Sequence, residues 1–179
     1  MRTFVAVEVC NQGTLNSIVK LQSDLAIKAS PVSRQNMHFT LFFLGEITGD
    51  AAYDVKTALS GISFKPIRVS FTHLGAFPNS KFPRVVWVGV DEVAAARLVE
   101  LAIQVEQKLA PLGFRQDKQF RPHLTIFRVR NREDGISDKM ARYSKVSLGE
   151  DVISELKFKQ SVLTSNGPIY SDLLVVKAQ

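Results

Sequence analysis

Apolar and polar residues follow two kinds of pattern along this chain, one typical of strands and one typical of amphipathic helices. In the helical runs apolar residues recur three or four positions apart, whereas the strand runs are short and rich in β-prone residues. The predicted strands cover residues 2–9, 66–74, 84–90, 155–164 and 169–177, and the predicted helices cover residues 14–29, 50–60, 92–110 and 133–143. Turn signals separate them at Ser30-Pro31, Gly61, the loop of residues 75–83, and Asn166-Gly167-Pro168.

Two further predicted strands begin with the same tripeptide pattern, His-x-Thr. The first runs from Met37 to Gly45 and the second from Pro122 to Val129. Because side chains alternate between the two faces of a strand, the histidine and the threonine of each copy share one face. The residues expected to point the other way, into a core, are Phe39, Leu41 and Phe43 in the first copy and Leu124 and Ile126 in the second.

The order strand, helix, His-x-Thr strand, helix, strand occurs twice and is followed by one more strand. We therefore expect a single domain, residues 1–179, with an internal repeat of residues 1–83 and residues 84–179 as two lobe units. A repeat of this kind is expected to pack about a pseudo-twofold axis. That symmetry predicts two similar lobes, each with an antiparallel sheet and two helices, and it places the two His-x-Thr strands next to the axis.

Two imidazoles on opposite sides of a cleft are suited to paired general acid and base catalysis. The ordinary pKa of histidine, about 6.5, lets His38 and His123 give and take protons near neutral pH. The hydroxyl groups of Thr40 and Thr125 can donate hydrogen bonds to an anion held between them. This arrangement fits in-line displacement at phosphorus, with one imidazole deprotonating the nucleophile and the other protonating the leaving oxygen.

The alternative for each motif is a half-buried polar face without chemistry. Two of the three histidines of the chain stand in the same tripeptide at the head of an apolar strand, and this favours the functional interpretation. Arg121 is the best candidate for a further contact with the anion, since it lies two residues before His123. Pro122 opposes a shared face, so a surface arginine is the alternative interpretation of Arg121.

Charge and composition indicate which ligands and which cellular setting suit the protein. The chain has a net charge of +6, and a basic surface favours polyanions such as nucleic acid or phosphorylated substrates, although a solvated basic face without a partner is equally compatible. The basic residues of the second half are Arg115, Lys118, Arg121, Arg128, Arg130, Arg132, Lys139, Arg142 and Lys145. No apolar run approaches the length of a membrane span. Cys10, the single cysteine, permits no intrachain disulfide, which fits a cytoplasmic protein.

The sequence contains no motif for a metal or a nucleotide cofactor. Metal sites usually need three or four ligands, and neither Cys-x-x-Cys nor His-Glu-x-x-His occurs. His73, the third histidine, is interpreted as a strand-end residue near the surface. The glycine-rich motifs that bind nucleoside triphosphates and dinucleotides are also absent. We therefore expect neither a metal nor a cofactor.

The sequence resembles a known family over nearly the whole chain. The chain looks like a 2H phosphoesterase, and most closely the RNA 2′,3′-cyclic phosphodiesterases historically called 2′-5′ RNA ligases. The segments that carry the resemblance are residues 2–7, the His-x-Thr stretch 37–45, residues 75–78 leading to 83–87, Phe120-Arg121-Pro122-His123-Leu124-Thr125, and residues 167–170.

The resemblance implies a bilobal α+β fold with the active site in the groove between the lobes. It implies metal-independent opening of a 2′,3′-cyclic phosphate at an RNA end to a 2′-phosphate, with reversible, ATP-independent 2′-5′ joining of tRNA halves as a further activity. By the same resemblance His38 and His123 form the acid–base pair, provisionally with His38 as the acid, and Thr40 and Thr125 bind the phosphate. We expect a monomer. Two other functions stay open, a phosphodiesterase acting on a small cyclic phosphate and a non-catalytic basic RNA-binding module.

Overall fold

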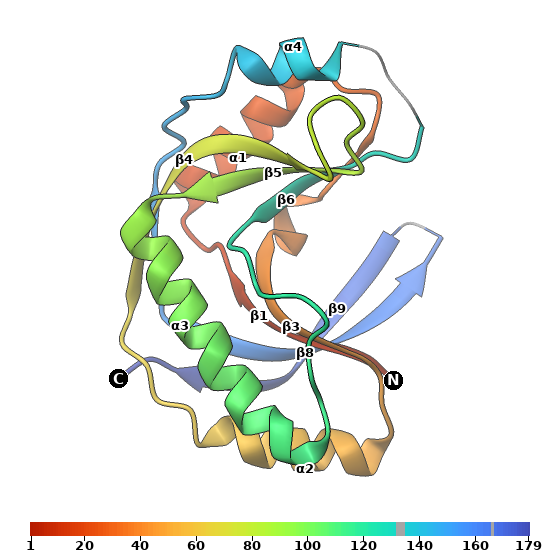
Figure 1. Cartoon of the computed structure of the whole chain (residues 1–179), viewed down its shortest axis with the longest axis vertical. Helices are drawn as coiled ribbons and strands as arrows, with labels where there is room; N and C mark the ends of the chain where they lie inside the picture. The colour runs from red at the N-terminus through yellow and green to blue at the C-terminus, as the bar shows by residue number, and fades with distance from the viewer. Residues whose placement is uncertain (132–134, 166) are drawn as a thin grey trace.

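The fold consists of nine strands and four helices in the part of the chain that the structure describes. A computed structural model describes residues 1–131, 135–165 and 167–179 (Figure 1). The strands are β1 (Arg2–Glu8), β2 (Ser30–Pro31), β3 (His38–Glu46), β4 (Ile67–Phe77), β5 (Val85–Val90), β6 (Leu124–Arg128), β7 (Glu150–Ile153), β8 (Glu155–Thr164) and β9 (Gly167–Lys177). The helices are α1 (Gln12–Leu25), α2 (Gly49–Ser60), α3 (Glu92–Leu109) and α4 (Ile136–Ala141), with short 3-10 turns at Arg34–Asn36 and Ala110–Leu112.

Local sequence sets the ends of the helices. Helices α1, α2 and α3 follow Asn11, Thr48 and Asp91, and each of these side chains accepts a backbone N–H from the first turn. Helix α1 ends four residues earlier than predicted, because Ala26 adopts the left-handed conformation. Of the predicted helix 133–143, residues 133 and 134 lie outside the described part of the chain, as does Asn166 of the predicted turn.

The strands form two antiparallel sheets, in the orders β3-β1-β8-β9 and β2-β6-β5-β4-β7. The His-x-Thr strands β3 and β6 occupy matching positions, each beside the first strand of its own repeat, β1 or β5. The third strand of each repeat lies in the sheet of the other repeat, because β4 pairs with β5 and β8 pairs with β1. The predicted units 1–83 and 84–179 therefore do not each form a lobe, and each sheet contains strands from both.

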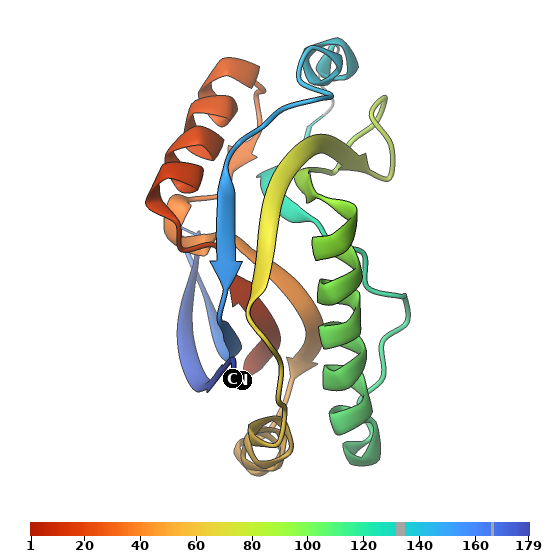
Figure 2. The same cartoon turned by 90° about the vertical axis from the view of Figure 1, so that its left-hand side faces the viewer.

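The helices are exchanged in the same way. Helix α1 contacts β6, whereas α3 contacts β3 and packs against α2. Helices α4 and α2 lie at opposite ends of the long axis of the molecule (Figures 1 and 2). A single cluster of buried side chains joins the two sheets, running from Val5 and Phe39 in one to Phe71 and Val88 in the other. Among the described residues, no helix is both long enough and apolar enough to cross a membrane.

Both His-x-Thr strands contain a β-bulge just after the threonine. In β3, Thr40 and Phe42 oppose consecutive residues of β1, so Leu41 is the inserted residue. In β6, Thr125 and Phe127 oppose consecutive residues of β5, so Ile126 is inserted. A bulge shifts the alternation of side chains by one position.

The bulges correct one prediction from the sequence. Phe39, Leu41, Leu124 and Ile126 are buried as expected, but Phe43 is 50% exposed. After the bulge Phe42 faces the core, and Phe43 lies on the side of the sheet that carries Thr40. There the guanidinium of Arg2 stacks over the Phe43 ring, 5.1 Å from its centroid. The equivalent position in β6 is Arg128.

Candidate active site

Both His-x-Thr motifs open into one pocket between the two sheets, with a volume of about 450 Å³. Its walls come from β3 and β6, from the segment of residues 30–36, and from the start of β9. His38 and Thr40 line it on one side, and His123 and Thr125 line it on the other. The structure therefore brings together the four residues that the sequence singles out.

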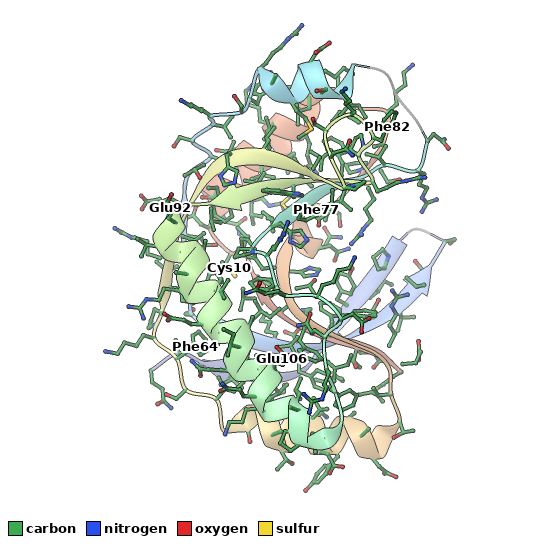
Figure 3. All side chains as sticks on the ribbon, in the orientation of Figure 1. Cys10, Phe64, Phe77, Phe82, Glu92 and Glu106 are labelled. Carbon is green, nitrogen blue, oxygen red and sulfur yellow. The ribbon has the colours of Figure 1, made fainter. Side chains whose placement is uncertain are left out.

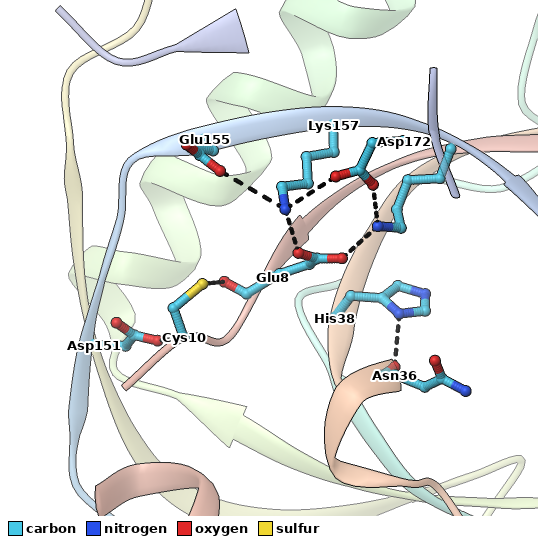
Figure 4. A network of polar contacts seen from close by, with 9 residues as sticks. Glu8, Cys10, Asn36, His38, Asp151, Glu155, Lys157 and Asp172 are labelled. Atoms are coloured by element: carbon cyan, nitrogen blue, oxygen red, sulfur yellow. Dashed lines mark hydrogen bonds and ion pairs between the residues drawn. The ribbon is translucent and has the colours of Figure 1, made fainter. Parts of the chain in front are cut away.

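The two imidazoles are held by the same kind of hydrogen bond. The Nδ1 atom of His38 lies 2.7 Å from the carbonyl oxygen of Asn36 (Figure 4), and Nδ1 of His123 lies 2.6 Å from the carbonyl oxygen of Arg121. A carbonyl oxygen only accepts, so Nδ1 carries the proton in each ring. Nε2 of each neutral ring is then the atom that exchanges a proton with a ligand. In His38 this atom lies 3.1 Å from the Thr40 hydroxyl, which donates to it in the free protein.

Aromatic side chains fix the planes of both rings. His38 lies between Phe4, with ring centroids 5.0 Å apart, and Tyr170, which meets it edge-on at 5.3 Å. His123 meets Phe77 edge-on at 5.0 Å and lies 6.3 Å from the ring of Trp87. Restricted rings reduce the reorganisation needed when a proton is transferred.

Burial makes both imidazoles harder to protonate in the free protein. It lowers the pKa of His38 to about 4 and also lowers the pKa of His123. The hydrogen bonds to Asn36 and Arg121 oppose this change, and the positive charge of Arg128 adds to it at both rings. An anion bound in the pocket would raise both pKa values again, because it stabilises the imidazolium form.

A partly buried ion network lies behind His38. Glu8 sits opposite His38 on β1 and accepts hydrogen bonds from Lys157, at 2.6 Å, and from Lys159 (Figure 4). Both lysines also pair with Asp172 of β9. Burial opposes the ionisation of Glu8, yet the two lysines outweigh it and hold the pKa of Glu8 below its usual value. The network thus ties β1, β8 and β9 together below the His38 ring.

The structure does not place the Arg121 side chain among the residues that line the pocket. Residues 121–123 precede β6, so strand alternation does not reach Arg121, and its contribution to the site is the carbonyl that holds His123. Arg128 and Arg130 line the pocket instead. Sequence reasoning missed Arg128 as a site residue, because only the bulge at Ile126 turns it toward the histidines.

His73 lies away from the pocket. It falls within β4 and not at a strand end as predicted, and its ring packs edge-on against Trp87 at 5.7 Å. A Cβ atom at Gly89 would clash with this ring, so the neighbouring strand leaves room for His73 only because it carries a glycine. Within the described residues, no three His, Cys, Asp or Glu side chains are grouped closely enough to hold a metal ion.

The fold and site together define a class of protein. Two imidazoles, each followed two residues later by a threonine, on strands of two pseudosymmetric sheets that face one pocket, are the arrangement of the 2H phosphoesterases. The family model for LigT-like phosphoesterases matches the chain twice, over residues 7–87 and 88–170. The chain belongs to this family, and the family resemblance seen in the sequence is confirmed.

Similar proteins extend over the whole chain. An RNA 2′,3′-cyclic phosphodiesterase of Archaeoglobus fulgidus is 43% identical over 178 residues, which are 98% of this chain and 99% of that protein. A protein of the same name from Aquifex aeolicus is 39% identical, over 86% of this chain and 84% of its own length.

Solved structures show the same architecture. The protein TT0787 of Thermus thermophilus superimposes with a TM-score of 0.81 at 25% identity, over 99% of this chain and 97% of its own. Escherichia coli LigT, solved in complex with 3′-AMP, superimposes with a TM-score of 0.77 at 20% identity, over 99% and 97% of the two chains. The predicted two-lobed α+β fold is thus confirmed.

Proposed function

We propose that the protein is an RNA 2′,3′-cyclic phosphodiesterase that opens a terminal cyclic phosphate to a 2′-phosphate by two-histidine acid–base catalysis. The observation that carries the proposal is the presence, in one pocket, of two imidazoles that are each held through Nδ1 by a backbone carbonyl, which leaves Nε2 as the proton-exchanging atom of both rings. Relatives that align with nearly the whole chain are named RNA 2′,3′-cyclic phosphodiesterases, which supports the choice of substrate.

In the proposed reaction the cyclic phosphate lies between the two motifs. The hydroxyls of Thr40 and Thr125 donate hydrogen bonds to its non-bridging oxygens, and Arg128 supplies a positive charge. One imidazole takes a proton from the attacking water through Nε2, and the other donates a proton to the 3′ oxygen as its bond to phosphorus breaks. The products are a 2′-phosphomonoester and a free 3′-hydroxyl.

The division of roles between the two histidines is an open part of the proposal. The sequence-based assignment makes His38 the acid and His123 the base. The hydrogen bonds that hold the two rings are equivalent, whereas the lower pKa of His38 in the free protein favours the reverse assignment. The bound phosphate anion changes both pKa values, so the roles must be tested with substrate present.

The same groups would support 2′-5′ ligation, a second reaction of the cyclic phosphate in which an alcohol replaces water as the nucleophile. With the 5′-hydroxyl of a second RNA in place of water, attack on the cyclic phosphate gives a 2′-5′ linkage without ATP, and tRNA halves are candidate substrates.

The single cysteine, Cys10, supports the expected cytoplasmic setting. We also retain the expectation of a monomer.

The test is single-turnover cleavage of a short RNA that ends in a 2′,3′-cyclic phosphate, in the presence of excess EDTA. We expect full activity and a product that carries a 2′-phosphate, because two imidazoles replace the metal as acid and base. A product with mainly 3′-phosphate, or activity lost in EDTA and restored by zinc or manganese, would contradict the proposal. Absence of any turnover, together with tight RNA binding, would instead indicate an RNA-binding module.

A further inference from the structure

A second hollow adjoins the active-site pocket on the side of the β4–β5 loop. It has a volume of about 230 Å³ and is formed by residues 81–84 of this loop and residues 129–131, which follow β6. Arg130 lines both hollows, so the two adjoin at this residue. Figure 3 labels Phe82 in the loop that projects beside the ends of β5 and β6. We call this hollow the β4–β5 groove.

The β4–β5 groove combines positive charge with an exposed aromatic ring. Lys81, Arg84 and Arg130 supply three cations, and none of the described residues that line it is acidic. The ring of Phe82 is 53% exposed beside them. An exposed aromatic ring among cations is the combination with which proteins bind single-stranded nucleic acid, since bases stack on the ring and phosphates pair with the cations.

Hydrogen bonds hold the groove in shape. The Asn79 side chain accepts the backbone N–H groups of Lys81 and Phe82, at 3.0 and 2.9 Å. The backbone N–H of Arg84 donates to the carbonyl of Phe77 at 2.7 Å, and its guanidinium donates to the carbonyl of Arg130 at 3.0 Å. The loop therefore presents Phe82 and Arg84 in a fixed position next to Arg130, which lowers the entropic cost of binding a ligand.

The opposite rim of the active site is apolar instead of positively charged. There the end of the β8–β9 hairpin carries exposed apolar side chains, with Val162, Leu163 and Ile169 between 49% and 67% exposed. These residues offer no charge to a phosphate. Of these two rims, the one that offers positive charge to a polyanion is therefore that of Arg130 and the β4–β5 groove.

We propose that the β4–β5 groove binds the single-stranded RNA that precedes the cyclic-phosphate end, with a base on Phe82 and backbone phosphates at Lys81 and Arg84. The inference rests on the proposed function and specifies its substrate as an oligonucleotide. It requires that the nucleotides upstream of the reacting one contribute to recognition, whereas a nucleoside cyclic phosphate occupies only the catalytic pocket.

The test compares kcat/KM for two substrates, uridine 2′,3′-cyclic phosphate and a five-nucleotide RNA with the same end. The variants are Phe82→Ala and the double variant Lys81→Gln/Arg84→Gln; Arg130 is left intact because it lines both hollows. We expect each variant to lower kcat/KM for the oligonucleotide by roughly 5-fold or more, through loss of a stacking contact in Phe82→Ala and of phosphate contacts in the double variant, and to leave the nucleoside substrate unchanged. The double variant should also flatten the salt dependence of oligonucleotide binding.

Tyr53→Ala is the matched control, because Tyr53 is 72% exposed on the distant helix α2 and should affect neither substrate. Thermal unfolding of each variant checks that the fold is kept. Equal losses on both substrates, or no loss on the oligonucleotide, would overturn the inference while the proposed function stands. Failure of the wild-type protein to open either substrate would overturn the proposed function and this inference with it. If Phe82→Ala abolishes self-association of the protein instead, the groove is a contact between copies of the chain.

Discussion

At the scale of single residues, a backbone carbonyl sets the tautomer of each imidazole. Asn36 and Arg121 each lie two residues before a histidine, and their carbonyl oxygens select the same tautomer in both rings. In both rings Nε2 is therefore the atom that exchanges a proton, and that of His38 already has a neighbour, the Thr40 hydroxyl at 3.1 Å. Any division into acid and base must arise from the surroundings of each ring and from the bound substrate.

Replacing the leaving 3′ oxygen of the cyclic phosphate by sulfur separates the two roles. A thiolate leaves without protonation, so loss of the general acid should matter little on this substrate. On the oxygen substrate we expect His38→Ala and His123→Ala each to slow the chemical step by about 10²- to 10⁴-fold. On the sulfur substrate we expect only one of the two variants to recover. Recovery of both, or of neither, would contradict a divided acid–base pair.

The low pKa of His38 also predicts how stability depends on pH. The unfolded chain binds a proton at His38 near pH 6.5, whereas the folded protein does so only near pH 4. Stability from this group is therefore complete above pH 6.5 and is lost as the pH falls to 4, by up to about 3 kcal/mol. Urea unfolding at pH 7 and pH 4 should show a smaller acid-induced loss for His38→Gln than for wild type. An identical loss in both proteins would disprove the buried, neutral state of His38.

A third experiment compares the effects of replacing Arg128 and Arg121 on kcat/KM. Arg128→Ala should lower kcat/KM by roughly 10- to 100-fold, since a charge-assisted hydrogen bond contributes about 1.5–3 kcal/mol. Arg121→Ala should stay near wild type, because its side chain lies outside the pocket and its carbonyl remains. The opposite ranking would restore the interpretation of Arg121 drawn from the sequence.

These two arginines also show what the sequence could and could not predict about the site. Period-two alternation correctly placed His38 with Thr40 and His123 with Thr125, because two residues of regular strand separate each pair. It failed for Phe43 and Arg128, which lie beyond an inserted residue. A bulge depends on the register with a neighbouring strand, and that register is a long-range property.

At the scale of elements, the ion network shows how strands of different repeats are joined. Lys159 is 5% exposed on β8 and pairs with Glu8 of β1 and Asp172 of β9. Removing one partner of a buried network leaves uncompensated charge, which is more costly than loss of a surface ion pair.

We expect Lys159→Met to reduce the free energy of unfolding by roughly 3 kcal/mol. Lys157→Met is the matched control, because the Lys157 side chain is more exposed and its loss leaves Lys159 in place. Lys157→Met should reduce the free energy of unfolding by clearly less than Lys159→Met does. Urea unfolding at pH 7 measures both, and equal costs would mean that burial of Lys159 does not determine the stability of the network.

The long elements were predictable, and two short strands were not. Strands β1, β5, β8 and β9 and helices α2 and α3 follow clear apolar patterns, and the structure places them within a few residues of the predicted bounds. Strand β2 has only two residues, and β7 has four. Their strand conformation depends on pairing with β6 and β4, which no local pattern reveals.

At the scale of the whole molecule, the repeat was visible in the sequence but the exchange of strands was not. The same order of elements is compatible with two lobes that each consist of one repeat, or with two lobes that exchange strands between the repeats. Pairing of β4 with β5 and of β8 with β1 decides between them, and both pairings join residues far apart or across the repeat boundary.

The exchange predicts cooperative unfolding. Neither 1–83 nor 84–179 contains all the strands of one sheet, so each fragment expressed alone should lack stable structure. In the intact chain, fluorescence of Trp87 in β5 and far-UV circular dichroism should report one coincident urea transition. Independent folding of either fragment, or two separated transitions, would show that the repeats are separate domains.

The exchanged strands have a consequence for the ancestry of the architecture. One repeat unit alone would carry a His-x-Thr strand and would lack the strand that completes its sheet. If two identical copies each donated the third strand to the other copy, both sheets would be complete. The result would be a strand-swapped homodimer with this topology. Its single pocket would lie on the symmetry axis, with one imidazole from each subunit. In a single chain the two repeats can differ in sequence, and here the loop that carries Phe82 and the hairpin that carries Leu163 give the pocket two different rims.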